Sequence, residues 1–128
     1  MKTEADVHDL EKVTGQLASI YSEITALAKK SPSDAVNGFK LRLINAVLIT
    51  ANRVLGEDYI PFSDFTQFDA DDVPSTSDVA LLVGQYIEEA ERFRSDNVQN
   101  VSGAWMYIVS NKPSEIRSRA PSRILKVK

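Results

Sequence analysis

Residues 39–55 read FKLRLINAVLITANRVL and form a strongly apolar segment of this 128-residue chain. Eleven of the 17 residues are apolar, and at helical spacing they fall on two adjoining tracks. One track holds Leu41, Ile44, Leu48, Ala51 and Leu55, and the other holds Phe39, Leu43, Val47 and Val54. A helix that contacts its core on one side needs an apolar stripe about 100° wide. Two tracks therefore predict a central helix that is covered from both sides.

The composition is that of an ordinary globular domain, with 43% hydrophobic and 26% charged residues. A chain of this length favours one domain, residues 1–128, with a core that needs no covalent staples. The lack of cysteine excludes disulfides, thiolate zinc sites and cysteine nucleophiles. The first residues are polar and acidic, without the apolar core of a signal peptide, and the longest apolar runs are too short to span a membrane. We therefore expect a soluble, cytoplasmic protein.

Two more helices are predicted beside the central one. Residues 4–29 carry a heptad-spaced seam, which consists of Leu10, Val13, Leu17, Ile20, Ile24 and Leu27. We expect this seam to pack on the central helix, and the alternative is packing against a second copy. Pro32 ends the first helix. The central helix is expected near 37–55, within a helical segment over 34–55, with Gly56 as its C-terminal glycine.

The third helix is predicted over 76–97. Ser75 and Asp78 have the spacing of a capping box at its start. Its single apolar face consists of Val79, Leu82, Val83, Tyr86, Ala90 and Phe93. A helix with one such face is expected to dock on the central helix.

The connection over 57–77, EDYIPFSDFTQFDADDVPSTS, is named here the acidic–aromatic loop. Aromatic rings recur every three residues, and aspartates lie between or after them. The candidate partner-binding residues are Tyr59, Phe62, Asp64, Phe65, Phe68, Asp69, Asp71 and Asp72. In one interpretation the rings pin the loop onto the helices while the aspartates face water. In the other, rings and carboxylates bind a basic amphipathic peptide.

No pattern of catalytic or cofactor-binding residues is recognisable. The only histidine, His8, lies near the start of the first helix, and no phosphate-binding or metalloprotease motif occurs. A calcium loop that starts at Asp69 fails, because Val73 and Pro74 occupy its fifth and sixth positions. We therefore predict no catalytic residue, metal or cofactor, and rank a metal-dependent enzyme that uses loop carboxylates last.

The C-terminal segment 103–128 is predicted to form a β-hairpin with a basic tail. Strands are expected over 104–109 and 115–120, followed by either a third strand or a loose basic end over 123–128. Residues 1–100 carry a net charge of −8, and residues 101–128 carry +5. The candidate basic surface consists of Trp105, Tyr107, Arg117, Arg119, Arg123 and Lys126. Such residues can bind nucleic acid. The alternatives are an acidic protein partner, or burial of both rings with the basic strand along the acidic–aromatic loop.

Together these features predict a mainly α fold: an antiparallel three-helix domain with a C-terminal β-hairpin. The function we expect is that of a non-enzymatic protein–protein interaction or assembly module, with self-association as one form of it. A nucleic-acid-binding accessory protein is the alternative, and no membrane contact is expected.

Overall fold

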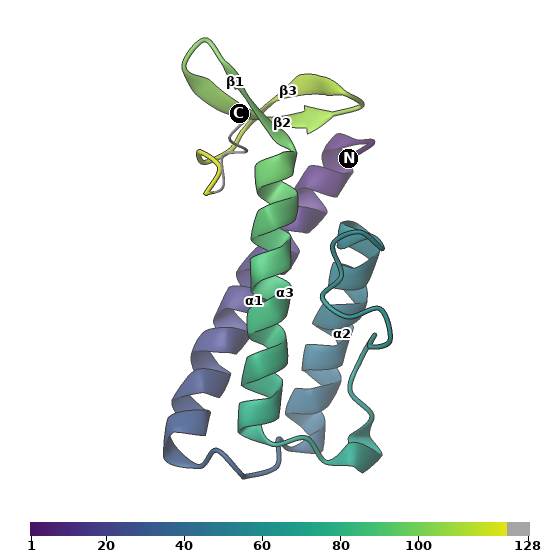
Figure 1. Cartoon of the computed structure of the whole chain (residues 1–128), viewed down its shortest axis with the longest axis vertical. Coiled ribbons are helices and arrows are strands. Elements are labelled where there is room, and N and C mark those ends of the chain that lie inside the picture. Colours follow the sequence, from purple (N-terminus) through teal and green to yellow (C-terminus); the bar gives the residue numbers. More distant parts are fainter. Residues whose placement is uncertain (123–128) are drawn as a thin grey trace, which may run out of the picture.

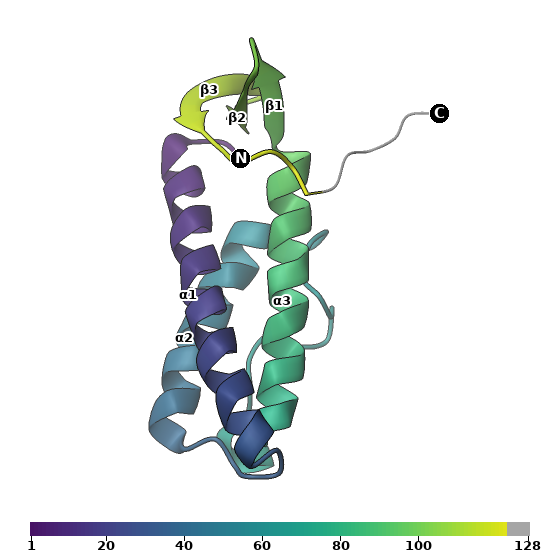
Figure 2. The ribbon, with the colours of Figure 1, turned by 90° about the vertical axis from the view of Figure 1, so that its left-hand side faces the viewer.

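The computed structural model describes residues 1–122 and contains three long helices and a small sheet. The elements are α1 (Glu4–Lys30), α2 (Gly38–Leu55), the 3₁₀ helix η1 (Ala70–Asp72), α3 (Thr76–Asp96), β1 (Val98–Val101), β2 (Ala104–Val109) and β3 (Lys112–Arg117). The helices lie lengthwise side by side, and the sheet covers one end of the bundle (Figures 1 and 2). The predicted helical domain with a C-terminal β element is thus confirmed in outline.

The course of the chain makes α2 and α3 parallel to each other and antiparallel to α1 (Figure 1). After α2 the acidic–aromatic loop runs back along the bundle before α3 begins. Both ends of the described chain, residues 1 and 122, lie near the sheet (Figure 2). The loop therefore lies along the helices rather than at one end.

Side-chain caps fix where the helices begin. The predicted capping box of Ser75 and Asp78 is present at α3, and Thr3 forms a second one with Asp6 at α1. Backbone N–H groups of Lys2 and Thr3 donate to the Asp6 carboxylate and lower its pKa. Both boxes use carboxylates to satisfy N–H groups that a helix start leaves without partners.

Helix α2 begins at Gly38, close to the predicted central helix near 37–55 and later than the outer predicted limit at residue 34. Asn37 caps it, because its side-chain oxygen accepts a 2.9 Å hydrogen bond from the Lys40 N–H. The residues before it are held in a different way. The Val36 N–H donates to the Pro74 carbonyl at 3.0 Å, and the Asp34 carbonyl accepts from the Thr76 N–H at 2.8 Å. This pairing keeps 34–36 out of the helix.

The predicted central position of α2 is wrong. Helix α1 packs more extensively on α3 than on α2. The first apolar track of α2 is buried as predicted, but on the second track Phe39 and Leu43 are 56% and 52% exposed. Val47 and Val54 are only partly buried. Helix α2 is therefore covered on one side, and its second track faces outward.

The core lies mainly between α1 and α3. Its α1 residues are Val7, Leu10, Val13, Leu17 and Ile24, and its α3 residues are Val79, Leu82, Val83, Tyr86, Ala90 and Phe93. The predicted apolar face of α3 is thus confirmed. Of the heptad seam of α1, Leu10, Val13, Leu17 and Ile24 are buried within one chain and Ile20 and Leu27 are partly buried, with α1 packing on α3 more than on α2.

The C-terminal element is a three-stranded antiparallel sheet of order β1-β2-β3 rather than a hairpin. Strand β1 follows α3 directly, and β3 begins three residues before the predicted second strand. The two connections, Ser102–Gly103 and Ser110–Asn111, have positive φ at both residues. This is the geometry of type I′ hairpin turns, whose twist suits antiparallel strands.

The sheet is joined to the rest of the chain at two places. Val98 and Tyr107, directly opposite each other in the sheet, are buried in the core. At the turn between β2 and β3, the Met1 carbonyl accepts a 2.9 Å hydrogen bond from the Ser110 N–H, and the Lys2 carbonyl accepts one from the Ser110 hydroxyl at 2.8 Å. The sheet is therefore fixed to the N-terminal end of α1. The third strand or loose basic end predicted over 123–128 lies outside the residues that the structure describes.

Candidate interaction surface

Two asparagines of α2 hold the acidic–aromatic loop. The side chain of Asn45 bonds both backbone groups of Phe68: its oxygen accepts from the N–H at 2.8 Å, and its Nδ2 donates to the carbonyl at 2.9 Å. Two helical turns later, Asn52 Nδ2 donates to the Thr66 carbonyl at 2.8 Å. These bonds replace the regular structure that the loop lacks, and they fix its path along α2.

The start of the loop is anchored on the last turns of α3 through Tyr59. Its hydroxyl donates a 2.6 Å hydrogen bond to Asp96, and its ring meets the Phe93 ring edge-on at 5.0 Å. The Arg92 guanidinium lies 4.3 Å from the Tyr59 ring centroid and donates to the Asp58 carbonyl at 2.7 Å. The bond to Asp96, aided by burial, raises the pKa of Tyr59 to about 12.

The predicted site residues of the loop divide into two groups. Tyr59, Phe65 and Phe68 pack against the core, whereas Phe62 is 44% exposed. The side chains of Asp64, Asp69, Asp71 and Asp72 are exposed, and in the part of the chain that the structure describes none of them forms an ion pair. Most rings therefore serve as anchors, and the carboxylates remain in solvent.

Val73, directly after η1, has an unusual conformation. Its φ of 47° lies in the left-handed region, and its side chain is 61% exposed. A β-branched residue is rare in this region, because its Cβ crowds the backbone. An exposed apolar side chain is thus held beside the aspartates of η1 at some cost in stability.

The outward face of α2 carries exposed apolar side chains: Phe39 and Leu43 belong to the second track, which was predicted to be covered, and Ile49 belongs to neither track. We name Phe39, Arg42, Leu43 and Ile49 the outer ridge. Phe39, Leu43 and Ile49 are each more than half exposed, and the Arg42 guanidinium lies 5.4 Å from the Phe39 ring centroid. The second apolar track in the sequence was the signal for this ridge, but its orientation could not be deduced from α2 alone.

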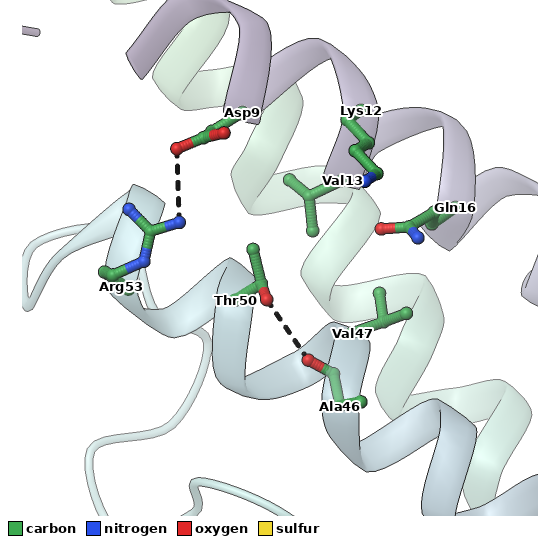
Figure 3. Close-up of a pocket in the computed structure, with 8 residues that line it drawn as sticks. All are labelled: Asp9, Lys12, Val13, Gln16, Ala46, Val47, Thr50 and Arg53. Carbon is green, nitrogen blue, oxygen red and sulfur yellow. Dashed lines mark hydrogen bonds and ion pairs between the residues drawn. The ribbon is translucent and has the colours of Figure 1, made fainter. Parts of the chain in front are cut away.

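The cations of α2 differ in their partners. Lys40 pairs with Glu23 of α1 at 3.1 Å, and Arg53 pairs with Asp9 of α1 at 3.2 Å (Figure 3). Arg42, in contrast, forms no ion pair with any residue in 1–122. Two cations thus fasten α2 to α1, and Arg42 points to no acidic partner of its own chain.

Grooves flank α2 on both sides. One, of about 320 Å³, lies between α1 and α2 and is bridged by the pair of Asp9 and Arg53 (Figure 3). The other, of about 400 Å³, is named the α2–loop groove. Its lining includes Arg42, Asn45, Ala46, Ile49, Gln67, Phe68 and Ala70. Arg42 and Ile49 of the outer ridge line one wall of this second groove, and residues of the acidic–aromatic loop line the other.

The candidate basic surface is less continuous than predicted. Tyr107 is 3% exposed and Trp105 is partly buried, so the Tyr107 ring does not offer a free stacking face. Arg117 and Arg119 are exposed, and Arg119 lies 3.7 Å from Glu91 of α3. The basic strand was expected along the acidic–aromatic loop, but this ion pair ties Arg119 to α3 instead. Arg123 and Lys126 lie outside the described residues.

A buried arginine that the sequence did not single out holds the end of the described chain. Arg94 donates to both oxygens of Glu91, at 2.7 and 2.6 Å, and to the Ser118 hydroxyl at 2.7 Å. Its remaining two N–H groups donate to the carbonyls of Arg119 and Ala120. All five donors of the guanidinium are used, and the two bonds that Glu91 accepts from Arg94 lower the pKa of Glu91 to about 2.

Residues 1–122 show no cluster of three acidic or histidine side chains placed to hold a metal ion, and His8 is exposed on α1. None of the helices in this range has the length and apolar character needed to cross a membrane. Comparison of the chain with protein-family models, curated proteins and solved structures found no match.

Proposed function

We propose that this protein is a non-enzymatic protein-interaction module, and that it binds through the outer ridge and the acidic–aromatic loop. One observation carries the proposal: Phe39, Leu43 and Ile49 are each more than half exposed on one helix, and the loop packed on that helix carries exposed aspartates that form no ion pair within residues 1–122. Contiguous exposed apolar side chains with a polar rim are typical of protein interaction sites. A single exposed leucine, such as Leu81 of α3, needs no such explanation.

The composition of the surface also fits protein binding. Aromatic and arginine side chains are enriched among the residues that contribute most to interface energy, and Arg42 with Phe39 is such a pair. The loop adds carboxylates, which steer the approach of a partner and reject like charge. The loop is also fixed by Asn45 and Asn52, so little conformational entropy is lost when a partner binds.

Site-specific photo-crosslinking in the cells that express the protein tests this proposal. Phe39 is replaced by photoreactive p-benzoylphenylalanine, and Leu81 is replaced in the control, because it is 69% exposed on α3. We expect protein adducts at position 39 that are absent at position 81. The adducts should also be lost when Leu43→Asp is added. Equal crosslinking at both positions, or none at position 39, would overturn the proposal.

A further inference from the structure

Two patches of opposite charge lie next to each other along the α2–loop groove. Arg42 and Ile49 line one wall, and Phe68 and Ala70 line the other. Within residues 1–122, Arg42, which lines the groove, forms no ion pair, and neither do the exposed carboxylates of Asp69 and Asp71, which flank the groove-lining Ala70 in the chain. Both patches also expose apolar side chains, the outer ridge on one side and Phe62 and Val73 on the other.

We propose that the α2–loop groove is one half of an interface between two copies of this chain. The inference rests on the proposed function and names the partner of that surface. In a twofold interface, residue i of one copy contacts residue j of the other, and residue j contacts residue i. A surface that pairs with itself in this way needs two neighbouring patches that complement each other, and the outer ridge and the loop meet this condition.

The geometry predicts which charges meet. A twofold axis parallel to α2 keeps every residue at its own height along the bundle. Arg42 shares the groove with Phe68 and Ala70, so it lies near the height of Asp71, which follows Ala70 in η1. Rotation about this axis places α2 of each copy over the loop of the other. Arg42 of one copy then faces Asp71 of the second copy, and symmetry forms the same pair again.

The apolar side chains of the two patches are covered by the same arrangement. The outer ridge of one copy lies over the loop of the other, where Val73 is exposed. The strained conformation of Val73 holds its side chain outward without any benefit to the core of its own chain. Strained backbone conformations persist where the surrounding structure holds them, and they cluster at functional sites. An exposed Val73 that contacts a second copy would be such a site.

Charge reversal in the purified full-length chain tests the inference. Sedimentation velocity and light scattering from micromolar to near-millimolar protein should show a species of twice the 14.2 kDa chain mass. Arg42→Glu and Asp71→Arg should each raise the dissociation constant at least tenfold, because each change places two like-charged pairs in the interface. Lys112→Glu, on exposed β3, changes the net charge as Arg42→Glu does, and it should leave the dimer unchanged.

The decisive sample is an equimolar mixture of the Arg42→Glu and Asp71→Arg chains. In the mixed dimer both contacts again join opposite charges, so we expect dimers to return to within about threefold of the wild-type dissociation constant. Circular dichroism and urea unfolding of each variant should match the wild type, because both side chains are exposed. A wild type that stays monomeric, or a mixture that shows no recovery, refutes the dimer. If crosslinking at position 39 then still captures other proteins, the interaction module stands without the dimer. If it captures nothing, the proposed function fails as well.

Discussion

The hydroxyl of Tyr86, buried in the middle of α3, donates a 2.5 Å hydrogen bond to the side-chain oxygen of Asn52 on α2. The same Asn52 donates through its Nδ2 to the Thr66 carbonyl of the acidic–aromatic loop. One amide therefore connects the core, α2 and the loop. A disturbance of the loop at Thr66 would therefore reach the buried Tyr86 through Asn52.

Asn52→Ala should lower the free energy of unfolding by about 1–3 kcal/mol, because it leaves the buried Tyr86 hydroxyl without a partner. Tyr86→Phe should cost about 0.5–1.5 kcal/mol, and the double variant should cost less than the sum of the two. Urea denaturation of the four proteins measures this coupling. Strictly additive effects would show that the hydrogen bond does not contribute to stability.

Asn45→Ala should release the loop from α2 without unfolding the helices. The variant removes both bonds to the Phe68 backbone, so amide exchange over 66–72 should accelerate by about tenfold or more, while exchange in α1 and α3 stays slow. Hydrogen–deuterium exchange with mass spectrometry reads this directly. Asn100→Ala, in the β1–β2 hairpin, is the matched control, and unchanged exchange at 66–72 in Asn45→Ala would contradict the role given to Asn45.

The Glu91–Arg94 pair predicts how stability depends on pH. The pKa of Glu91 falls from its ordinary value near 4.5 to about 2 in the folded chain. Its contribution is therefore present above about pH 4.5 and is lost as the pH falls through 2. Glu91→Gln should destabilise the protein by about 1–3 kcal/mol at pH 7, and this difference should shrink below pH 4.5.

Urea unfolding of wild type and variant at several pH values between 7 and 2 measures this change. Glu23→Gln removes the exposed pair with Lys40 and serves as the control, with an expected effect below about 1 kcal/mol. A difference between wild type and Glu91→Gln that does not vary with pH would show that the carboxylate charge is not what Arg94 binds.

The hydrogen bond of Tyr59 predicts a loss of stability at high pH, whereas the Glu91–Arg94 pair predicts one at low pH. The pKa of Tyr59 is raised from 10 to about 12, first by the hydrogen bond to Asp96. The stability that this bond supplies is therefore complete below pH 10 and is lost as the pH rises through 12. Asp96→Asn should bring the pKa of Tyr59 back toward 10. NMR titration of the tyrosine ring carbons follows it residue by residue, with Tyr21 as the internal comparison, and an unchanged Tyr59 curve would refute the assignment.

The helices were predictable because their periodicity is a local property. The face of α3 and the seam of α1 follow from spacing alone, as does the capping box of Ser75 and Asp78. The start of α2 could be predicted only as a range, 34 to 37, because Ser31 to Asp34 offer equally good caps and only the pairing with residues 74–76 rules them out. That pairing joins segments far apart in the sequence.

The first strand of the sheet and the orientation of the interaction surface also depend on contacts between distant segments, so local sequence patterns did not predict them. Strand β1 contains Gln99 and Asn100 and has no alternating apolar pattern, so the sequence did not indicate that it pairs with β2. The two tracks of α2 were visible, but which of them faced the core depended on α3 packing against α1. Of the predicted loop residues, the aspartates and Phe62 face solvent, whereas the other three rings are anchors. The hydrogen bonds of Asn45 and Asn52 to the loop backbone depend on the course of the loop along α2, so they could not be predicted from the sequence.

The pairing of α1 with α3 has a consequence for synthesis on the ribosome. When α1 and α2 have emerged, the main partner of α1 has not yet been made, because α3 follows the whole of segment 31–75. The apolar seam of α1 is then only partly covered. Because α1 can pack on α3 only after a long loop has closed between them, the seam is buried late in folding. During that interval the nascent chain offers the same apolar side chains to chaperones that the finished protein hides.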